Sequence, residues 1–380
     1  MKNVYTVIFC LFGFFIALTA NGQDDQKRSI RLIFAGDVMG HSGQIVSAEV
    51  KTGELYDYTP CFQYVKPLVS DADLAIANLE LTLPGKPPYT GYPQFKSPNE
   101  LALALKDAGF DLLVTANNHS NDSYASGLIN TLDVLDGYHF LHTGTFRNSD
   151  ERLMYYPLLV YKNDFRIAFL NYTYGTNGIP TREPTIVNLI DVAQMEKDLA
   201  EAKSLKPDAI IVIMHWGLEY QLQQSTEQDF LTQKLFDGGA DFIIGAHPHV
   251  VQPIKEVELE RDGKKKKGLV VYSMGNYISS QTKTNTDGGI MVELTLEKDL
   301  SSKETILKEH TFIPIWRYIR TLENGKKEYL ILTDNELEKP GLLTPDAKLK
   351  MESYFKRLRN HLANSDGIEK PISTESVDVK

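Results

Sequence analysis

The chain has 380 residues, which is enough for one large domain or two smaller ones with a substantial core. Its composition is that of a folded protein, with 42% hydrophobic and 24% charged residues. The 40 basic and 50 acidic side chains leave a formal net charge of -10, which argues against nucleic acid as a main partner.

Residues 1–22 are predicted to form a secretory signal peptide. Lys2 precedes an apolar run from Val4 to Ala20, and a second small residue follows at Gly22. A short basic segment, an apolar segment and small residues before a cleavage point are the parts of such a signal, with cleavage expected before Gln23. The apolar run is also close to the roughly 17–25 residues that span a bilayer, so an uncleaved membrane anchor is the alternative. We therefore expect an exported protein, either periplasmic or at the cell surface.

From about residue 30 the chain alternates apolar, β-branched runs with amphipathic segments. Nearly continuous apolar runs are typical of strands that are covered on both faces of a sheet. Strands are expected at Arg31–Ala35, Leu74–Ala77, Leu112–Ala116, Phe165–Asn171, Ala209–Met214, Phe242–Ile244, Leu269–Ser273 and Ile290–Leu296. Helices are expected at Asn99–Gly109, Ser123–Asp136, Asp191–Lys206 and Thr226–Gly238. Repeated strand–helix units predict an α/β fold.

The last third of the chain is expected to be richer in β-structure. Two short runs flank the charged segment 261–268, which predicts a β-hairpin with a solvated, lysine-rich tip. Ile306–Arg317 continues this region. Thr344 and Pro345 then begin a final helix, with Thr344 as its cap, that reaches about Leu362. The polar residues 364–380 are expected to form a flexible tail.

Six short segments place acid, amide or imidazole groups at or near the ends of apolar runs. They are Phe34–His41, Asn78–Glu80, Asn117–Asp122, His215–Gly217, Gly245–His249 and Tyr272–Asn276. Because ligands gather at the carboxyl ends of strands in parallel α/β sheets, these groups are expected to meet at one edge. The candidate metal ligands are Asp37, Glu80, Asn118, His215, His247 and His249.

Carboxylate, imidazole and amide oxygen together suit two divalent metal ions such as Mn, Fe or Zn. A pair of metals about 3.5–4 Å apart activates water and stabilises an anionic transition state, which predicts a metal-dependent hydrolase. His119 is the candidate for protonating the leaving group, and Asp122 for orienting His119 or lying near the substrate.

Each candidate also has a structural explanation. Asp37 could cap a helix, Asn118 could be a turn residue, and a single histidine after a strand is more often structural than a ligand. The pair His247 and His249 is harder to explain in this way, because alternate residues of an extended segment point to the same side. The joint placement of the six candidates therefore supports the metal site better than any single residue does.

The order of these segments resembles that of the CapA family of bacterial capsule and poly-γ-glutamate proteins, in the calcineurin-like metallophosphoesterase superfamily. The matching segments are Gly36–Met39, Asn78–Glu80, Asn117–Asp122, His215–Tyr220, Gly245–Gln252 and Tyr272–Tyr277. The resemblance implies a four-layer α/β/β/α sandwich of two mixed sheets. It also implies one domain over 23–363, with a core at about 30–280 and a C-terminal extension over 281–363.

The resemblance further implies the roles of single residues. Asp37 and His249 would hold one metal, and Asn118, His215 and His247 the other, with Glu80 between them and His119 as general acid. The superfamily begins its first motif Asp-x-His, but this chain has Met39 at the third position, and it has Glu80 where an Asp is usual. His41 is the candidate for replacing the missing imidazole or for binding substrate anions. The other candidate substrate-binding or pocket residues are Glu219, Gln252 and Asn276, with Tyr172, Tyr174, Trp216 and Tyr220 as either a substrate wall or core packing.

Three functions are compatible with the sequence. The first is a secreted metal-dependent hydrolase or transferase in capsule or poly-γ-glutamate synthesis or processing. The second is a phosphoesterase that acts on a phosphorylated envelope intermediate. The third is a non-catalytic accessory subunit that binds the polymer or a membrane synthase complex.

Overall fold

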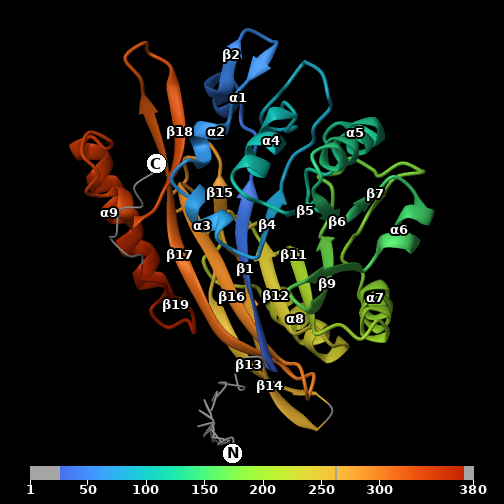
Figure 1. Cartoon of the computed structure of the whole chain (residues 1–380). Helices are drawn as coiled ribbons and strands as arrows, with labels where there is room; N and C mark the ends of the chain where they lie inside the picture. The colour runs from blue at the N-terminus through green and yellow to red at the C-terminus, as the bar shows by residue number, and fades with distance from the viewer. Residues whose placement is uncertain (1–25, 262, 372–380) are drawn as a thin grey trace, which may run out of the picture.

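The computed structural model describes residues 26–261 and 263–371 (Figure 1). The predicted signal peptide over residues 1–22 lies outside the described residues, as do residues 372–380. Among the described helices, none is both long enough and apolar enough to cross a membrane.

The first sheet is nine-stranded and mixed. Its central strand, β1, pairs in parallel with β4 and antiparallel with β16. Its main path is β18 (Lys327–Leu332), β17 (Thr305–Thr321), β16 (Gly288–Asp299), β1 (Lys27–Val38), β4 (Leu74–Leu79), β5 (Leu112–Val114) and β6 (Leu141–Thr143), with β15 (Asn276–Ile278) beside β1 and β19 (Ile368–Glu369) beside β17. Strand β16, from the predicted C-terminal extension, therefore lies beside the central strand of this sheet.

The second sheet is six-stranded and also mixed, because its two edge strands run antiparallel to their neighbours. Its order is β13 (Ile254–Arg261), β14 (Lys264–Val271), β12 (Phe242–Ala246), β11 (Ala209–His215), β9 (Phe165–Thr173) and β8 (Leu158–Lys162). Two small ribbons pair β2 (Glu49–Lys51) with β3 (Leu55–Tyr56) and β7 (Thr145–Phe146) with β10 (Ile186–Val187). Each strand expected from the sequence overlaps a strand of one of the two large sheets.

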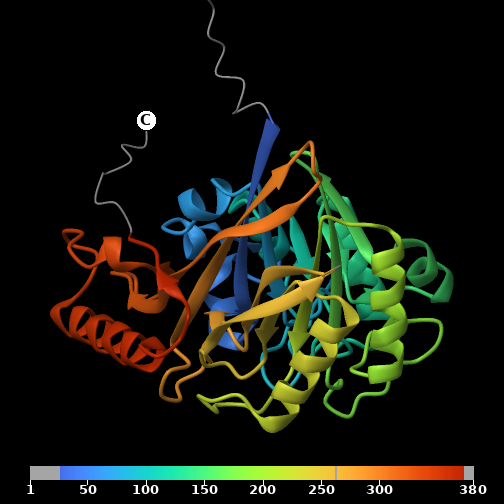
Figure 2. The ribbon, with the colours of Figure 1, turned by 90° about the horizontal axis from the view of Figure 1, so that it is seen from below.

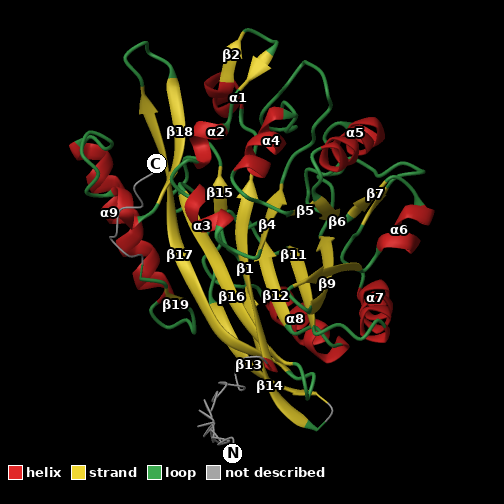
Figure 3. Ribbon diagram, in the orientation of Figure 1, coloured by secondary structure: helices red, strands yellow, loops and turns green. Residues whose placement is uncertain are grey.

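The helices lie outside the strands (Figure 3). They are α1 (Ser42–Ala48), α2 (Thr59–Phe62), α3 (Lys66–Ser70), α4 (Glu100–Asp107), α5 (Tyr124–Gly137), α6 (Ser149–Tyr155), α7 (Val192–Ser204), α8 (Thr226–Gly238) and α9 (Pro345–Leu362), with a short 3₁₀ turn, η2, at Asp334–Glu336. The four central helices predicted from periodicity are α4, α5, α7 and α8.

Alternation along the strands builds the layers. On β1, Leu32 and Phe34 face the core between the two sheets, while Ile33 faces α2, α3 and α4. On β11, Ile211 faces the same inner core and Val212 faces the core against α7 and α8. Each sheet is therefore covered on both faces, and the predicted four-layer α/β/β/α sandwich is confirmed.

Helix α9 packs on β17, on the opposite flank of the molecule from α7 (Figure 2). Thr344 accepts a hydrogen bond from the Ala347 N–H at 3.2 Å, which confirms its predicted role as the cap. The predicted flexible tail does not begin at residue 364. Ile368–Glu369 pairs with β17, and Ser365 accepts a bond from the Ile254 N–H, so the chain is tied to both sheets beyond α9.

The lysine-rich segment is part of a strand and not a loop tip. Strand β14 begins at Lys264, which lies opposite Arg261 on β13. Lys265 pairs with Glu258 across the ribbon, and Lys267 with Glu256, both at 2.8 Å. Acidic side chains on β13 therefore face lysines on β14. These cross-strand charge pairs favour continuing the two strands through the lysine-rich segment.

A glycine on β12 allows the close approach of a neighbouring strand end. A Cβ added at Gly245 would stand 2.0 Å from the Tyr272 carbonyl oxygen. We expect Gly245→Ala to lower the free energy of unfolding by about 1–3 kcal/mol or more, because neighbouring backbone has to move. The matched control is Gly137→Ala at the end of α5, where an added Cβ meets nothing within 4 Å. The control should be neutral or stabilising by up to about 1 kcal/mol, and urea denaturation of both variants is the test.

Candidate metal centre

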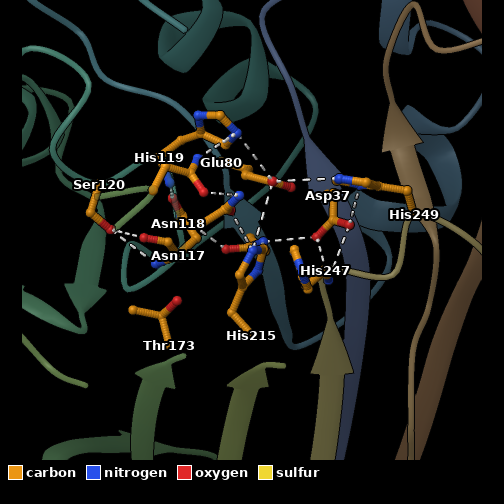
Figure 4. A network of polar contacts seen from close by, with 12 residues as sticks. Asp37, Glu80, Asn117, Asn118, His119, Ser120, Thr173, His215, His247 and His249 are labelled. Atoms are coloured by element: carbon orange, nitrogen blue, oxygen red, sulfur yellow. Dashed lines mark hydrogen bonds and ion pairs between the residues drawn. The ribbon is translucent and has the colours of Figure 1, made fainter. Parts of the chain in front are cut away.

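Polar side chains from both sheets meet where the strands end (Figure 4). Asp37 lies near the end of β1, and Glu80 directly follows β4. From the second sheet come His215, the last residue of β11, and His247, which directly follows β12. The remaining members are Asn118 and His119, which follow β5, and His249, which follows His247 by two positions. All of these side chains are buried, and Figure 4 shows them together. The six candidate ligands therefore meet at one edge, as expected from the sequence.

Asn78 joins the two halves of this cluster. Its Nδ2 donates to Asp37 Oδ1 at 2.8 Å and lies 3.2 Å from His215 Nδ1. Its Oδ1 accepts from Asn117 Nδ2 at 3.3 Å. On the other side, Asp37 Oδ2 lies 3.1 Å from His249 Nδ1. Asp37 is thus held by an amide on one side and an imidazole on the other, and neither Asn78 nor Asn117 was predicted to have a role here.

Glu80 lies in the middle of the cluster (Figure 4). Its Oε1 lies 3.7 Å from His215 Nε2 and 3.9 Å from both His119 Nε2 and His249 Nε2. Neither carboxylate oxygen has a hydrogen-bond partner among the described residues. Burial, and next the charge of Asp37, raises the pKa of Glu80 well above its ordinary value. A buried carboxylate without partners is costly unless a cation neutralises it.

The donors fit divalent metal ions. Two sets of ligand atoms each lie within 4.8 Å of one another and share Glu80: Glu80 with His247 and His249, and Glu80 with Asp37 and His215. His247 Nδ1 is also buried without a partner among the described residues. Glu80 is the one residue that the two sets share, and its place between two metals stays a prediction. The two sets, however, associate His247 with His249 and His215 with Asp37, unlike the division that the family resemblance implied.

Two imidazoles of the cluster, those of His215 and His247, are held in the neutral form that binds metals. Burial, and next the neighbouring His249, lowers the pKa of His247 to about 3. Burial, and next His247, lowers the pKa of His215 well below its ordinary value. Asn118 Oδ1 lies 2.7 Å from His215 Nε2, so the amide oxygen and the imidazole converge on one place.

His247 and His249 reach the cluster from an unusual backbone. Their φ angles are +99° and +60°, in the left-handed region that residues with side chains rarely adopt. The expected extended segment with alternate residues on one side is therefore wrong, although the two ring centres lie only 5.7 Å apart. Backbone of this kind is concentrated at functional sites, where the surrounding structure holds it in place.

His119 is oriented by Asp122, as one of the two sequence expectations proposed. His119 Nδ1 lies 2.6 Å from Asp122 Oδ2, which also accepts the Phe95 N–H at 2.5 Å. The Phe95 ring packs edge-on against the imidazole, with ring centres 4.5 Å apart. With Nδ1 bound to the carboxylate, His119 directs Nε2 towards Glu80. This is the geometry of a positioned proton donor or acceptor.

The aromatic candidates divide into two kinds. Tyr172 and Trp216 are core residues, because the Tyr172 hydroxyl donates to Asp198 and Trp216 Nε1 donates to the Tyr272 carbonyl. Tyr174 is 48% exposed, and its ring centre lies 4.6 Å from that of His247. The Tyr220 ring lies 6.1 Å from that of His249. Tyr174 and Tyr220 therefore border the metal centre, and the other two do not.

The predicted substrate-binding residues also have different surroundings. Gln252 is fully buried, accepts from Gln228 Nε2 and donates to the carbonyls of Gln221 and Gln223, so it holds the loop after β11 and is not a substrate contact. Glu219 is exposed in that loop, and its charge contributes to raising the pKa of Glu80.

The candidate substrate residue Asn276 is used within the protein. Its Oδ1 lies 3.1 Å from His249 Nδ1, and its Nδ2 donates to Gln281 Oε1 and to the Thr286 carbonyl. All its polar atoms are satisfied, so it orients His249 instead of meeting a substrate.

In the superfamily motif a histidine stands at the position of Met39. His41 does not take the place of that histidine, since it belongs to neither set of ligand atoms found among the described residues. Its Nδ1 lies 3.3 Å from Gln44 Oε1 and accepts the Ser280 N–H at 3.2 Å. Burial lowers the pKa of His41 to about 4, so near neutral pH it is uncharged and supplies no positive charge for an anion.

The lowered pKa of His41 predicts a dependence of stability on pH. The unfolded chain protonates His41 near its ordinary value of 6.5, whereas the folded protein does so only near 4. The contribution of His41 to the free energy of unfolding is therefore fully present above pH 6.5 and is lost as the pH falls towards 4. We expect His41→Asn, which keeps an acceptor for the Ser280 N–H, to reduce this acid loss by up to roughly 3 kcal/mol. Urea denaturation of both metal-free proteins across this pH range measures the difference, and parallel curves would contradict the prediction.

Comparison with known proteins gives the family. The model of the family described as bacterial capsule synthesis protein PGA_cap matches residues 31–281. The chain is 27% identical over 323 residues to the PGA biosynthesis protein CapA of Bacillus subtilis strain 168, covering 78% of each. It is 28% identical over 284 residues to the capsule biosynthesis protein CapA of Bacillus anthracis, covering 71% of this chain and 65% of that protein. The chain thus spans slightly less than two thirds of the Bacillus anthracis relative.

Similar solved structures are more distant. They include the NAD nucleotidase of Haemophilus influenzae, at 12% identity and a TM-score of 0.49 over 87% of this chain and 63% of that one. They also include the calcineurin-like phosphoesterase YfkN of Bacillus subtilis, at 13% identity and a TM-score of 0.46 over 89% of this chain and 99% of that one. The family assignment depends on the sequence match, which covers most of the chain and contains the whole cluster. This chain belongs to the bacterial capsule synthesis protein family.

Proposed function

We propose that the protein is an exported, metal-dependent hydrolase or transferase that acts in the synthesis or processing of a capsule or poly-γ-glutamate polymer. The observation that carries this proposal is Glu80, a fully buried carboxylate whose two oxygens lack partners among the described residues. It is shared by two sets of ligand atoms that suit a pair of divalent ions. The names of the relatives supply the polymer, and the predicted signal peptide supplies the location.

The residues around Glu80 have distinct tasks in such a reaction. Two bound metals would supply an activated water and stabilise negative charge on the reacting group. His119 presents Nε2 to the same space and is placed to give a proton to the leaving group. Asp122 holds the other ring nitrogen and stabilises the imidazolium before that proton is given. Tyr174 and Tyr220 border the centre, with their rings beside those of His247 and His249.

A phosphoesterase acting on a phosphorylated envelope intermediate is the second candidate. The pairing of His119 and Asp122 beside the shared carboxylate favours it, because a metal pair with a proton donor suits an in-line displacement at phosphorus. Met39, where the superfamily has an imidazole, leaves one expected ligand absent. The third candidate, an accessory subunit of a membrane synthase complex, needs no proton donor beside the ligands.

One assay separates the three candidates. The mature protein is loaded with Mn²⁺ and incubated with poly-γ-glutamate and, separately, with a chromogenic phosphoester. Chain shortening seen by size-exclusion chromatography, and lost with a chelator, supports the proposal. Phosphate release without chain shortening supports the phosphoesterase. Metal and polymer binding without either product, and without transfer of the polymer to an added amine acceptor, would show an accessory protein.

A further inference from the structure

An open groove of about 1070 Å³ lies between β17, the start of α9 and the loop that follows Ser280. It is outside the cluster around Glu80. Five basic side chains line it against three acidic ones, although the whole chain has a net charge of -10. The basic residues are Lys283, Arg317, Arg320, Lys350 and Arg357. Arg320 is paired with Glu328 and Lys350 with Asp346, so Lys283, Arg317 and Arg357 are the lining cations outside these ion pairs, and they favour an anionic ligand.

Arg317 is the unusual member of this lining. It is only 9% exposed, and its Nη2 donates to the Gln281 carbonyl at 2.9 Å. Within the described part of the chain its Nε has no hydrogen-bond partner, and the guanidinium makes no ion pair. Asp287 attracts it without such a contact. A buried guanidinium of this kind is costly, and a carboxylate ligand would compensate it with the planar, forked geometry that arginine prefers.

Asp287 indicates that the ligand also carries a hydrogen-bond donor. Its Oδ2 accepts from Trp316 Nε1 at 2.9 Å, whereas its Oδ1 is buried without a partner among the described residues. Both Asp287 and Arg317 line the groove. A ligand that carries N–H donors as well as carboxylates would satisfy both side chains. An amide-linked acidic chain has both groups, and a polyphosphate has no such donor.

The groove adjoins the metal centre through one loop. Lys283 lines the groove, and its Nζ lies 3.6 Å from the centre of the Tyr220 ring, which borders His249. Gln281 accepts from Arg317 through its carbonyl and from Asn276 through its side chain. The loop that lines the groove therefore also contacts Tyr220 and Asn276, the neighbours of His249.

We propose that this groove binds a stretch of an amide-linked, carboxylate-bearing chain, with Arg317 and Lys283 as its anchors. The identity of the chain rests on the proposed function, but binding in the groove requires no turnover. Groove binding and catalysis can therefore fail independently of each other.

The test is fluorescence anisotropy of a labelled γ-linked oligoglutamate with the full mature, metal-loaded protein. We expect Arg317→Gln to weaken binding by about tenfold or more, as for a lost charge-assisted hydrogen bond. Lys283→Gln should weaken binding by up to about fivefold, and because the position is an exposed loop the substitution leaves the fold intact. The matched control is Lys308→Gln, on the same strand β17 but outside the groove, which should bind like the wild type. Metal content is measured in every variant.

Each outcome of the binding assay either supports or overturns the proposed groove. Weaker oligoglutamate binding in both groove variants, with normal metal content and an unaffected control, supports the proposal. A wild type that hydrolyses its substrate but does not bind oligoglutamate, or groove variants that bind normally, overturns the groove and leaves the proposed function intact. Equal, Arg317-dependent binding of an oligouronate of the same charge overturns the assignment to an amide-linked chain.

Discussion

Glu80→Gln is expected to remove metal binding and, at the same time, to stabilise the metal-free protein. The wild-type carboxylate is fully buried without partners among the described residues, and an amide of the same shape carries no charge to bury. The free energy of unfolding of the metal-free variant should rise by about 1–4 kcal/mol near neutral pH. Metal affinity should fall by more than the roughly 10–100-fold that follows loss of a residue supporting a ligand.

The stabilising half of this prediction depends on pH. The pKa of Glu80 is raised in the folded protein. The contribution of Glu80 to the free energy of unfolding of the wild type is therefore fully present below the ordinary pKa of 4.5 and is lost as the pH rises. The advantage of the variant should therefore grow above 4.5 and vanish below it. Thermal melting with and without Mn²⁺ measures both halves, with the exposed Glu309→Gln as control. A variant that is less stable without metal at neutral pH would contradict this explanation.

His119→Ala is expected to lower kcat by about 10²–10⁴-fold while metal content stays that of the wild type. The reason is that His119 belongs to neither set of ligand atoms, whereas Asp122 holds its Nδ1 and its Nε2 faces Glu80, where it is placed for proton transfer. Asp122→Asn should cost less, because the imidazole remains and only its orientation and the stability of its charged form are affected.

The double variant tests whether the pair acts as a unit. With His119 removed, the further change Asp122→Asn should have little added effect on kcat. Fully additive losses would mean that Asp122 acts on its own, for example through the Phe95 N–H. Loss of metal in the His119 variant would instead make His119 a ligand and not a proton donor.

Periodicity and the polar segments predicted much of this molecule. The apolar runs located the strands because strands buried on both faces need continuous apolar sequence, and the topology of α/β sheets then brought Asp37, Glu80 and His215 to one edge. The family resemblance supplied the stacking of two sheets, which apolar periodicity does not encode. The sequence match to the family model later confirmed that resemblance.

Other features depend on contacts between distant residues and were not predicted. Nothing local in the sequence shows that Asn78 bridges Asp37 and His215, or that Asn276 orients His249. The left-handed backbone at His247 is likewise imposed by its surroundings. The signal that Asn78 offered was its place two residues before Glu80, directly after the predicted strand Leu74–Ala77. Gln252 offered the same kind of signal and proved to be a structural residue of the loop after β11.

Metal analysis of the purified mature protein tests the central claim most directly, with Asp37→Ala and His247→Ala measured alongside. Both variants remove a ligand atom from one of the two sets that share Glu80. We predict close to a pair of transition-metal equivalents in the wild type and their loss in both variants. A wild type that contains no metal and cannot be reconstituted with Mn²⁺, Fe²⁺ or Zn²⁺ would contradict the account and leave a polymer-binding protein in its place.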